Sequence, residues 1–183
     1  WTVKTAALLV IGDEILTGKV KDDNSFVFAQ TMYAQGVKVT RIVTIPDEID
    51  VIADKVEKCA KKFDYLCTSG GVGPTHDDKT LDGVALGLSL PLVEHQEALR
   101  YFQREQSLAG RGETVSVFPG VPYLFEKLMT GFAHLFKGGK FFRGSVFTNK
   151  SENTIAIDLK NMQDRYPGVA IGSYPQMSGK SYN

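Results

Sequence analysis

The sequence predicts a doubly wound α/β fold built on a mainly parallel sheet. Strand-like and helix-like segments alternate along most of the chain, and short turns containing glycine or proline separate them. The first strand-like segment, residues 6–11, is an apolar run without polar alternation, which is typical of a strand covered on both faces. Strands and helices that alternate with short turns favour a parallel sheet with helices packed against it.

Four segments have the composition of strands, and a turn closes each of them. We expect them to lie side by side in one sheet, because they are unalternating or rich in β-branched residues and have helical segments between them. The predicted strands are residues 6–11, 38–45, 64–68 and 114–118.

Helical periodicity marks the segments between these strands. In residues 49–63, apolar side chains recur at steps of three and four residues, and Lys and Glu fall on the opposite face. Weaker patterns of the same kind predict helices over residues 24–35, 81–88 and 125–132.

The character of the chain changes after residue 137. Residues 137–140 are a linker-like break, 141–148 resemble a strand, 155–162 resemble a helix, and 169–173 are again apolar. A tail of this size is too small for a core of its own. We therefore expect an α/β domain over residues 1–137, and a small α+β extension, or the start of a truncated second subdomain, over residues 138–183.

Composition excludes several classes of partner. The chain has 183 residues, and its 21 Lys and Arg balance 21 Asp and Glu. A global basic field for nucleic acid is therefore not expected, and no apolar run approaches the roughly 18 residues that span a bilayer. Cys59 and Cys67 lie in apolar stretches, which is typical of buried thiols in a reducing compartment, so we expect a cytoplasmic protein.

Each predicted strand is followed by glycines, by carboxylates or by both. In open α/β sheets, ligands bind at the carboxyl ends of the strands. Glycines let backbone N–H groups approach phosphate oxygens, whereas carboxylates beside a phosphate require a bridging divalent cation, which hard oxygen ligands identify as Mg²⁺ or a close relative. The post-strand segments are Gly12-Asp13-Glu14, Pro46-Asp47-Glu48, residues 69–78 and Pro119-Gly120-Val121-Pro122.

Each of these residues also has a structural interpretation. Single glycines can be ordinary turn residues, and Asp13 can belong to a solvated turn. Asp47 can cap the following helix, Asp77 and Asp78 can complement a helix dipole, and His76 can serve as a structural hydrogen-bonding residue. The density of residues 69–78 argues for more than a turn, because three glycines, a proline, a histidine and two aspartates in ten residues are costly for stability.

These motifs resemble a known family. The run Gly70-Gly71-Val72-Gly73-Pro74-Thr75-His76-Asp77-Asp78 is similar to the glycine-rich signature of the molybdopterin-binding (MoCF) domains. Gly12-Asp13-Glu14-Ile15-Leu16, Gly18 and Asn24 are similar to the opening motif of the branch that holds CinA-type proteins and eukaryotic FAD synthases. Ile45-Pro46-Asp47-Glu48 with Thr75-His76-Asp77-Asp78 resembles the FAD synthase end of that branch most closely, and Gly172-Ser173-Tyr174-Pro175 fits the same pattern.

The resemblance implies a three-layer α/β sandwich that forms homo-oligomers, for which Phe141, Phe142 and Val146 are candidate interface residues. It further implies that Asp47 and Asp78 are catalytic and hold Mg²⁺ at a phosphoanhydride, with Asp13 as a third candidate metal ligand. The expected substrate-binding residues are Gly12, Ser69, Gly70, Gly71, Gly73, Thr75, His76, Gly120 and Pro122.

Three functions follow as alternatives from this resemblance. The first is a divalent-metal-dependent pyrophosphohydrolase acting on FAD or ADP-ribose-like dinucleotides. The second is a molybdopterin adenylyltransferase or pterin-binding domain, although Asp77 stands where that branch usually has a basic residue. The third is a non-catalytic nucleotide-binding or regulatory domain. Residues 106–113 are also shorter than the corresponding segment of CinA-type proteins.

Overall fold

A four-stranded parallel sheet forms the centre of the computed structural model, which describes residues 3–76, 78–92 and 114–175. The strand order is β2-β1-β3-β4, and every neighbouring pair is parallel, as predicted. The strands are β1 (Thr5–Ile11), β2 (Lys38–Ile45), β3 (Tyr65–Ser69) and β4 (Thr114–Phe118).

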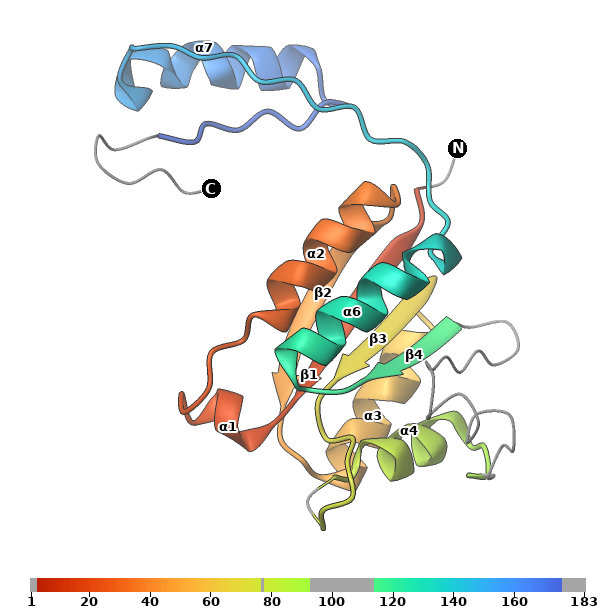
Figure 1. The fold of residues 1–183 in the computed structure, drawn as a ribbon. Coiled ribbons are helices and arrows are strands. Elements are labelled where there is room, and N and C mark those ends of the chain that lie inside the picture. The colour runs from red at the N-terminus through yellow and green to blue at the C-terminus, as the bar shows by residue number, and fades with distance from the viewer. Residues whose placement is uncertain (1–2, 77, 93–113, 176–183) are drawn as a thin grey trace. The chain divides into compact units, whose positions relative to one another are not determined.

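Helices cover both faces of this sheet (Figure 1), which confirms the three-layer prediction. One face carries α2 (Asn24–Ala34) and α6 (Pro122–Phe132), and the other carries α3 (Ile49–Ala60) and α4 (Thr80–Leu88). Two short elements complete this part of the chain: α1 (Asp13–Leu16) after β1 and the 3-10 helix η1 (Ala133–Leu135) after α6.

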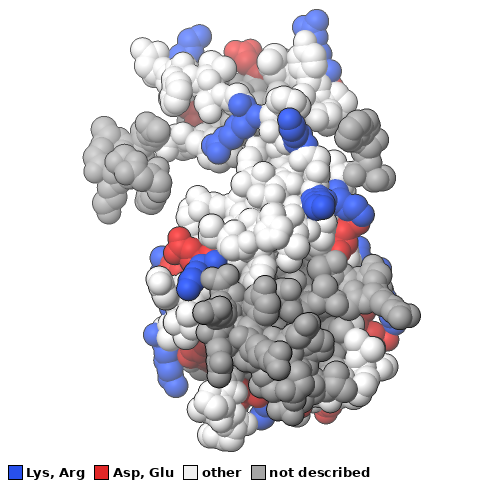
Figure 2. Space-filling model, turned by 45° about the vertical axis from the view of Figure 1, so that its right-hand side comes forward, with Lys and Arg blue, Asp and Glu red and all other residues white. Residues whose placement is uncertain are grey.

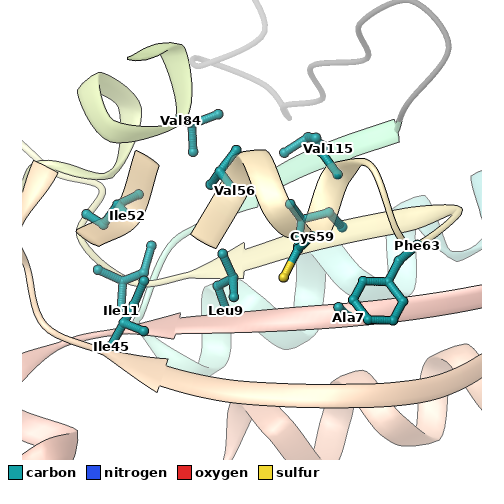
Figure 3. Close-up of a cluster of buried hydrophobic side chains, with 12 residues drawn as sticks. Ala7, Leu9, Ile11, Ile45, Ile52, Val56, Cys59, Phe63, Val84 and Val115 are labelled. Atoms are coloured by element: carbon teal, nitrogen blue, oxygen red, sulfur yellow. The ribbon is translucent and has the colours of Figure 1, made fainter. Parts of the chain in front are cut away.

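The packing of β1 explains why its sequence shows no polar alternation. Successive side chains of a strand point to opposite faces. Leu9 and Ile11 belong to the hydrophobic cluster with α3 and α4 that Figure 3 shows, whereas Leu8 and Val10 belong to the cluster with α2 and α6. Both faces of β1 are therefore core.

The predicted linker at residues 137–140 is hydrogen-bonded to the end of α2. Gly138 and Gly139 donate their backbone N–H groups to the carbonyl oxygens of Gln35 (3.0 Å) and Gly36 (3.1 Å) at the end of α2. Gly36 has a φ of +71°, and a Cβ on it would lie 1.5 Å from the Gly139 carbonyl oxygen. The glycines of this segment form a close backbone contact, whereas their composition alone suggested a linker.

The chain divides into two compact units, Trp1–Phe141 and Phe142–Asn183. In the second unit the described regular element is α7 (Glu152–Arg165), which agrees with the helix predicted there. The strand predicted over residues 141–148 is wrong, because this segment has no regular structure and no partner strand among the described residues. The apolar stretch at 169–173 is likewise irregular.

The candidate interface residues have different environments. The ring of Phe141 stacks on Tyr33 of α2 with 5.1 Å between centroids, so it packs on its own unit. Phe142 and Val146 are 94% and 95% exposed. The homo-oligomer remains a prediction.

Charges of both signs lie interspersed on the face of the first unit in Figure 2. Exposed ion pairs of this unit include Lys58 with Asp54 and Lys61 with Glu57 on α3. Within the described part of the chain, no helix combines the length and apolarity needed to cross a membrane.

Both cysteines are buried free thiols, as predicted. Burial raises the pKa of Cys59 and, far more strongly, that of the fully enclosed Cys67. Both thiols are therefore held in their neutral form, which is poorly nucleophilic.

Candidate functional site at the carboxyl edge of the sheet

The loops after the four strands meet at one edge of the sheet. The strand ends are level, since Ile11 pairs with Ile45, and Ser69 pairs with both Val10 and Phe118. Hydrogen bonds continue this alignment into the loops: Gly12 N–H donates to the Ile45 carbonyl and Gly70 N–H to the Phe118 carbonyl, both at 3.1 Å. The sheet thus brings together the segments that the sequence singled out.

Gly70 and Gly71 are required by the shape of their own loop. Their φ angles are +103° and +60°, which side-chain-bearing residues rarely adopt. A Cβ on Gly70 would lie 2.0 Å from the Ile11 carbonyl oxygen, and one on Gly71 would lie 2.3 Å from Thr80 Oγ1. A side chain at either position would therefore distort the loop itself, whether or not it also blocked a ligand.

Thr80, the first residue of α4, is hydrogen-bonded to this loop. It is fully buried, and its hydroxyl donates to the Gly70 carbonyl at 2.8 Å while its N–H donates to the Gly71 carbonyl at 3.1 Å. Sequence reasoning missed this residue. Its signal was a hydroxyl at a helix start that directly follows the glycine-rich loop.

Asp47 connects the loops after β2 and β1. Its Oδ2 accepts the backbone N–H of Asp13 at 3.0 Å, and its Oδ1 lies 3.0 Å from the position that a Cβ on Gly71 would take. The N-cap position of α3 is occupied by Glu48, and no side-chain capping bond is formed there. Asp47 is therefore directed toward the glycine loop, which supports its predicted place in the site.

Asp78 closes the other end of the same loop. Its Oδ2 accepts the Thr75 N–H at 2.8 Å and the Thr75 hydroxyl at 2.5 Å. The same oxygen lies 2.7 Å from the position of a Cβ on Gly73. The carboxylates of Asp47 and Asp78 thus lie against Gly71 and Gly73, two glycines of one loop.

Two carboxylates, those of Asp47 and Asp78, lie beside this loop. Among the described residues, no three or more His, Cys, Asp or Glu side chains come together as a metal-binding group. Asp13 contributes its backbone N–H to Asp47, and its side chain is exposed. Mg²⁺ is commonly held by one or two carboxylates together with substrate phosphates, and Asp47 and Asp78 supply two carboxylates of that kind.

A second group of predicted residues lines a small pocket on the α2 and α6 side of the edge. Ser69, Gly70, Gly120 and Pro122 all contribute to it. Gly12 is buried at the end of β1, whereas Thr75 and His76 are exposed on the glycine loop. Asp77 and residues 106–113 lie outside the described residues.

Asn24 connects two residues that line this pocket, Ser69 and Gly120. It is 6% exposed, and its amide nitrogen donates to Ser69 Oγ and to the Gly120 carbonyl oxygen, both at 2.8 Å. Sequence reasoning identified Asn24 only as part of a motif. A physical signal was present, because Asn24 precedes the buried Phe28 and Met32 at four-residue steps and so falls on the buried face of α2.

Two family models match successive parts of the chain. Residues 7–137 match the family described as "Probable molybdopterin binding domain", and residues 140–183 match the one described as "FAD synthase, middle domain".

Relatives and solved structures agree with these matches. A protein of Archaeoglobus fulgidus is 30% identical over 194 residues, which covers 92% of this chain and 85% of that protein. A "Probable FAD synthase" of Caenorhabditis briggsae is 49% identical over 82 residues, which covers 45% of this chain but only 16% of that protein. The crystal structure of CinA from Thermoplasma acidophilum superposes with a TM-score of 0.65 at 24% identity, covering 73% of this chain and 98% of that one.

The level strand ends, the glycine loop flanked by two aspartates and the match over residues 7–137 lead to one assignment. The chain belongs to the molybdopterin-binding domain family, with similarity to the FAD synthase and CinA-like members of that family.

Proposed function

We propose that this chain is a divalent-metal-dependent pyrophosphohydrolase of the FAD synthase-like branch, acting on FAD or ADP-ribose-like dinucleotides. The observation that carries the proposal is the placement of Asp47 and Asp78 against one glycine loop at the carboxyl edge of a parallel sheet. The similarity to FAD synthases supports the dinucleotide as substrate class.

In this proposal the chain's own residues position the phosphoanhydride. The backbone of the loop over residues 70–73 approaches the phosphate oxygens, and its glycines give the loop the shape that this requires. Asp47 and Asp78 hold the cation at the edge of this loop, and one of them orients the attacking water. A bound divalent cation would neutralise charge on the phosphate oxygens and make the phosphorus more electrophilic.

The reaction adds one water molecule across the phosphoanhydride bond. FAD then gives AMP and FMN, and ADP-ribose gives AMP and ribose 5-phosphate. One phosphate leaves with the oxygen that bridged the two phosphorus atoms, and the other takes up the oxygen of the water.

The test is AMP release from FAD and from ADP-ribose, measured with Mg²⁺, Mn²⁺ or Co²⁺ and with a chelator. We expect Asp47→Asn and Asp78→Asn to lose roughly two or more orders of magnitude in rate, the scale of removing a principal electrostatic element. Asp158→Asn is the matched control, because Asp158 is an exposed aspartate of α7 outside this unit. It should retain full activity.

Three results would redirect the assignment. Full activity of Asp78→Asn contradicts the two-carboxylate mechanism. Transfer of AMP from ATP to molybdopterin favours the adenylyltransferase. Nucleotide binding without turnover under every metal condition favours the non-catalytic domain.

A further inference from the structure

The carboxylate of Glu14 lies over the end of the inner strand β1. Glu14 is the second residue of α1, and its side chain turns back toward Gly12. A Cβ placed on Gly12 would lie 2.6 Å and 2.7 Å from the two carboxylate oxygens of Glu14. Gly12 is buried and directly follows β1. The carboxylate therefore lies against a residue that the sequence analysis expected to bind the substrate.

This position is next to the glycine loop. The carbonyl oxygen of Ile11, the residue before Gly12, would lie 2.0 Å from a Cβ placed on Gly70. Glu14 and Gly70 also line the same pocket. On the other side of Gly12, the N–H group of the next residue donates to Asp47 Oδ2 at 3.0 Å. The Glu14 carboxylate thus lies at the part of the sheet edge where the proposed function places the phosphates.

The negative charge of Glu14 is not offset within the part of the chain that the structure describes. Its carboxylate has no hydrogen bond or ion pair there. Lys21, which lines the same pocket, pairs with Asp23 at 2.6 Å instead. No three or more His, Cys, Asp or Glu side chains of these residues form a metal-binding group, so Glu14 does not join Asp47 and Asp78 as a third ligand. A phosphate at the end of β1 therefore meets a carboxylate whose charge is not neutralised.

We propose that Glu14 is a specificity-determining residue, which disfavours ligands that end in a phosphate monoester and so favours the internal phosphoanhydride of a dinucleotide. The inference rests on the proposed function, which places the phosphates at residues 70–73. A terminal phosphate carries about two negative charges at pH 8, because its second pKa is about 6, whereas each phosphate of a dinucleotide carries one. Repulsion by a nearby carboxylate grows with the charge of the phosphate. The same repulsion weakens the binding of AMP and FMN, the products of FAD hydrolysis.

The experiment compares ligands that differ by one charge at the phosphate. AMP is paired with its methyl ester, and FMN with its methyl ester, because the methyl group blocks the second ionisation and leaves the rest of the ligand unchanged. Dissociation constants are measured at pH 8 by calorimetry for the AMP pair and by flavin fluorescence for the FMN pair. Each measurement is made with a chelator and again with Mg²⁺, so that binding is known with and without a cation that screens the phosphate. The result is the ratio of the two constants in each pair.

Glu14→Gln removes the charge and keeps the size of the side chain. We expect it to tighten the monoester of at least one pair about ten-fold relative to its methyl ester, the scale of one charge acting at short range. Glu14→Ala should shift the ratio equally, because both variants lose the same charge. Neither change removes a hydrogen bond or ion pair of the described residues, so both variants should fold.

Glu57→Gln is the matched control. Glu57 is an exposed glutamate in the second half of α3, where it pairs with Lys61, and its replacement changes the net charge by the same amount. This variant should keep the wild-type ratio.

An unchanged ratio for both pairs in Glu14→Gln overturns the role of Glu14. A shift in Glu14→Ala alone shows that the side chain acts through its size, and an equal shift in Glu57→Gln shows an effect of net charge, so either result also overturns it. Failure of the four ligands and of both dinucleotides to bind in either condition overturns both proposals. A shifted ratio without AMP release in metal contradicts only the proposed activity, and AMP release with an unchanged ratio contradicts only the role of Glu14.

Discussion

At the scale of single residues, the site depends on hydrogen bonds that fix loops to one another. Asp47 joins the loops after β1 and β2, Asn24 joins the end of β3 to the loop after β4, and Thr80 joins α4 to the glycine loop. Each bond is formed by a side chain whose partner is at least 10 residues away in sequence. The geometry of the site is therefore a product of the whole sheet edge.

Thr80→Val tests this arrangement with a substitution of nearly the same shape. It removes the hydroxyl that donates to the Gly70 carbonyl and leaves that carbonyl without its donor. We expect the free energy of unfolding to fall by about 1–2 kcal/mol, as measured by urea denaturation. Thr130→Val on α6 is the control, because Thr130 is exposed and a change there should have little effect. Equal midpoints for the two variants would contradict the structural role of Thr80.

At the scale of elements, α3 and α4 approach so closely that α4 needs glycine at the contact. A Cβ on Gly83 would lie 2.6 Å from the Cβ of Ile52, and one on Gly87 would lie 2.5 Å from the Ala53 carbonyl oxygen. The glycines of α4 lower its helix propensity but allow two backbones to pack.

Gly87→Ala and Gly131→Ala should therefore have opposite effects. Gly87→Ala forces α3 and α4 apart, and we expect a loss of about 1–3 kcal/mol. A Cβ added to Gly131 of α6 would meet no described atom within 4 Å, so alanine there should stabilise the protein by about 0.5–1 kcal/mol through helix propensity. Thermal unfolding of both variants measures the difference, and a stabilised Gly87→Ala would show that the helices separate at no cost.

The start of β3 is held to the start of β1 by Asp64. Its carboxylate accepts hydrogen bonds from Lys4 Nζ (2.6 Å), Thr5 N–H (2.9 Å) and the Thr5 hydroxyl (3.0 Å). The Lys4 hydrogen bond is the main cause that lowers the pKa of Asp64 from 3.8 to about 2, and the Thr5 N–H adds to it.

This lowered pKa predicts a pH-dependent stability. Because the folded state holds Asp64 ionised to lower pH than the unfolded chain does, its contribution is complete above about pH 4 and is lost as the pH falls to about 2. Asp64→Asn should be less stable than the wild type at neutral pH, by a small amount because the pair is partly exposed. The difference should shrink in acid. Denaturation of both proteins at several pH values tests it, and a constant difference would contradict this account.

An element could be predicted from the sequence when its burial leaves a pattern in its own residues. β1 and α3 were predictable because burial on two faces, or on one helical stripe, leaves a local pattern. The segment 141–148 has strand-like composition, but a strand also needs a partner, and composition does not reveal one.

The same limit applied to the site. The topology of a parallel sheet was enough to place Asp47 and the glycine loop at one edge. The direction in which Asn24 points, and the clash that makes Gly70 a structural glycine, depend on contacts between residues far apart in sequence. Such contacts appear only in three dimensions.

At the scale of the whole molecule, both hydrophobic clusters lie between Ala6 and Phe136, within the first unit. Helix α7 of the second unit has no buried residue. We therefore propose that the molybdopterin-binding-type domain folds by itself, and its end can be located by truncation.

A chain that ends at Phe141 should unfold cooperatively, with a midpoint within a few degrees of the full chain. A chain that ends at Lys137, the boundary expected from the sequence, should be less stable. It lacks the hydrogen bonds of Gly138 and Gly139 to the end of α2 and the stacking of Phe141 on Tyr33. Two such hydrogen bonds and one aromatic pair are together worth about 2–4 kcal/mol.

Circular dichroism during heating compares the three chains. Equal midpoints for the two truncated chains would show that residues 138–141 add nothing to the domain, and loss of cooperative unfolding in both would show that the second unit is part of its core.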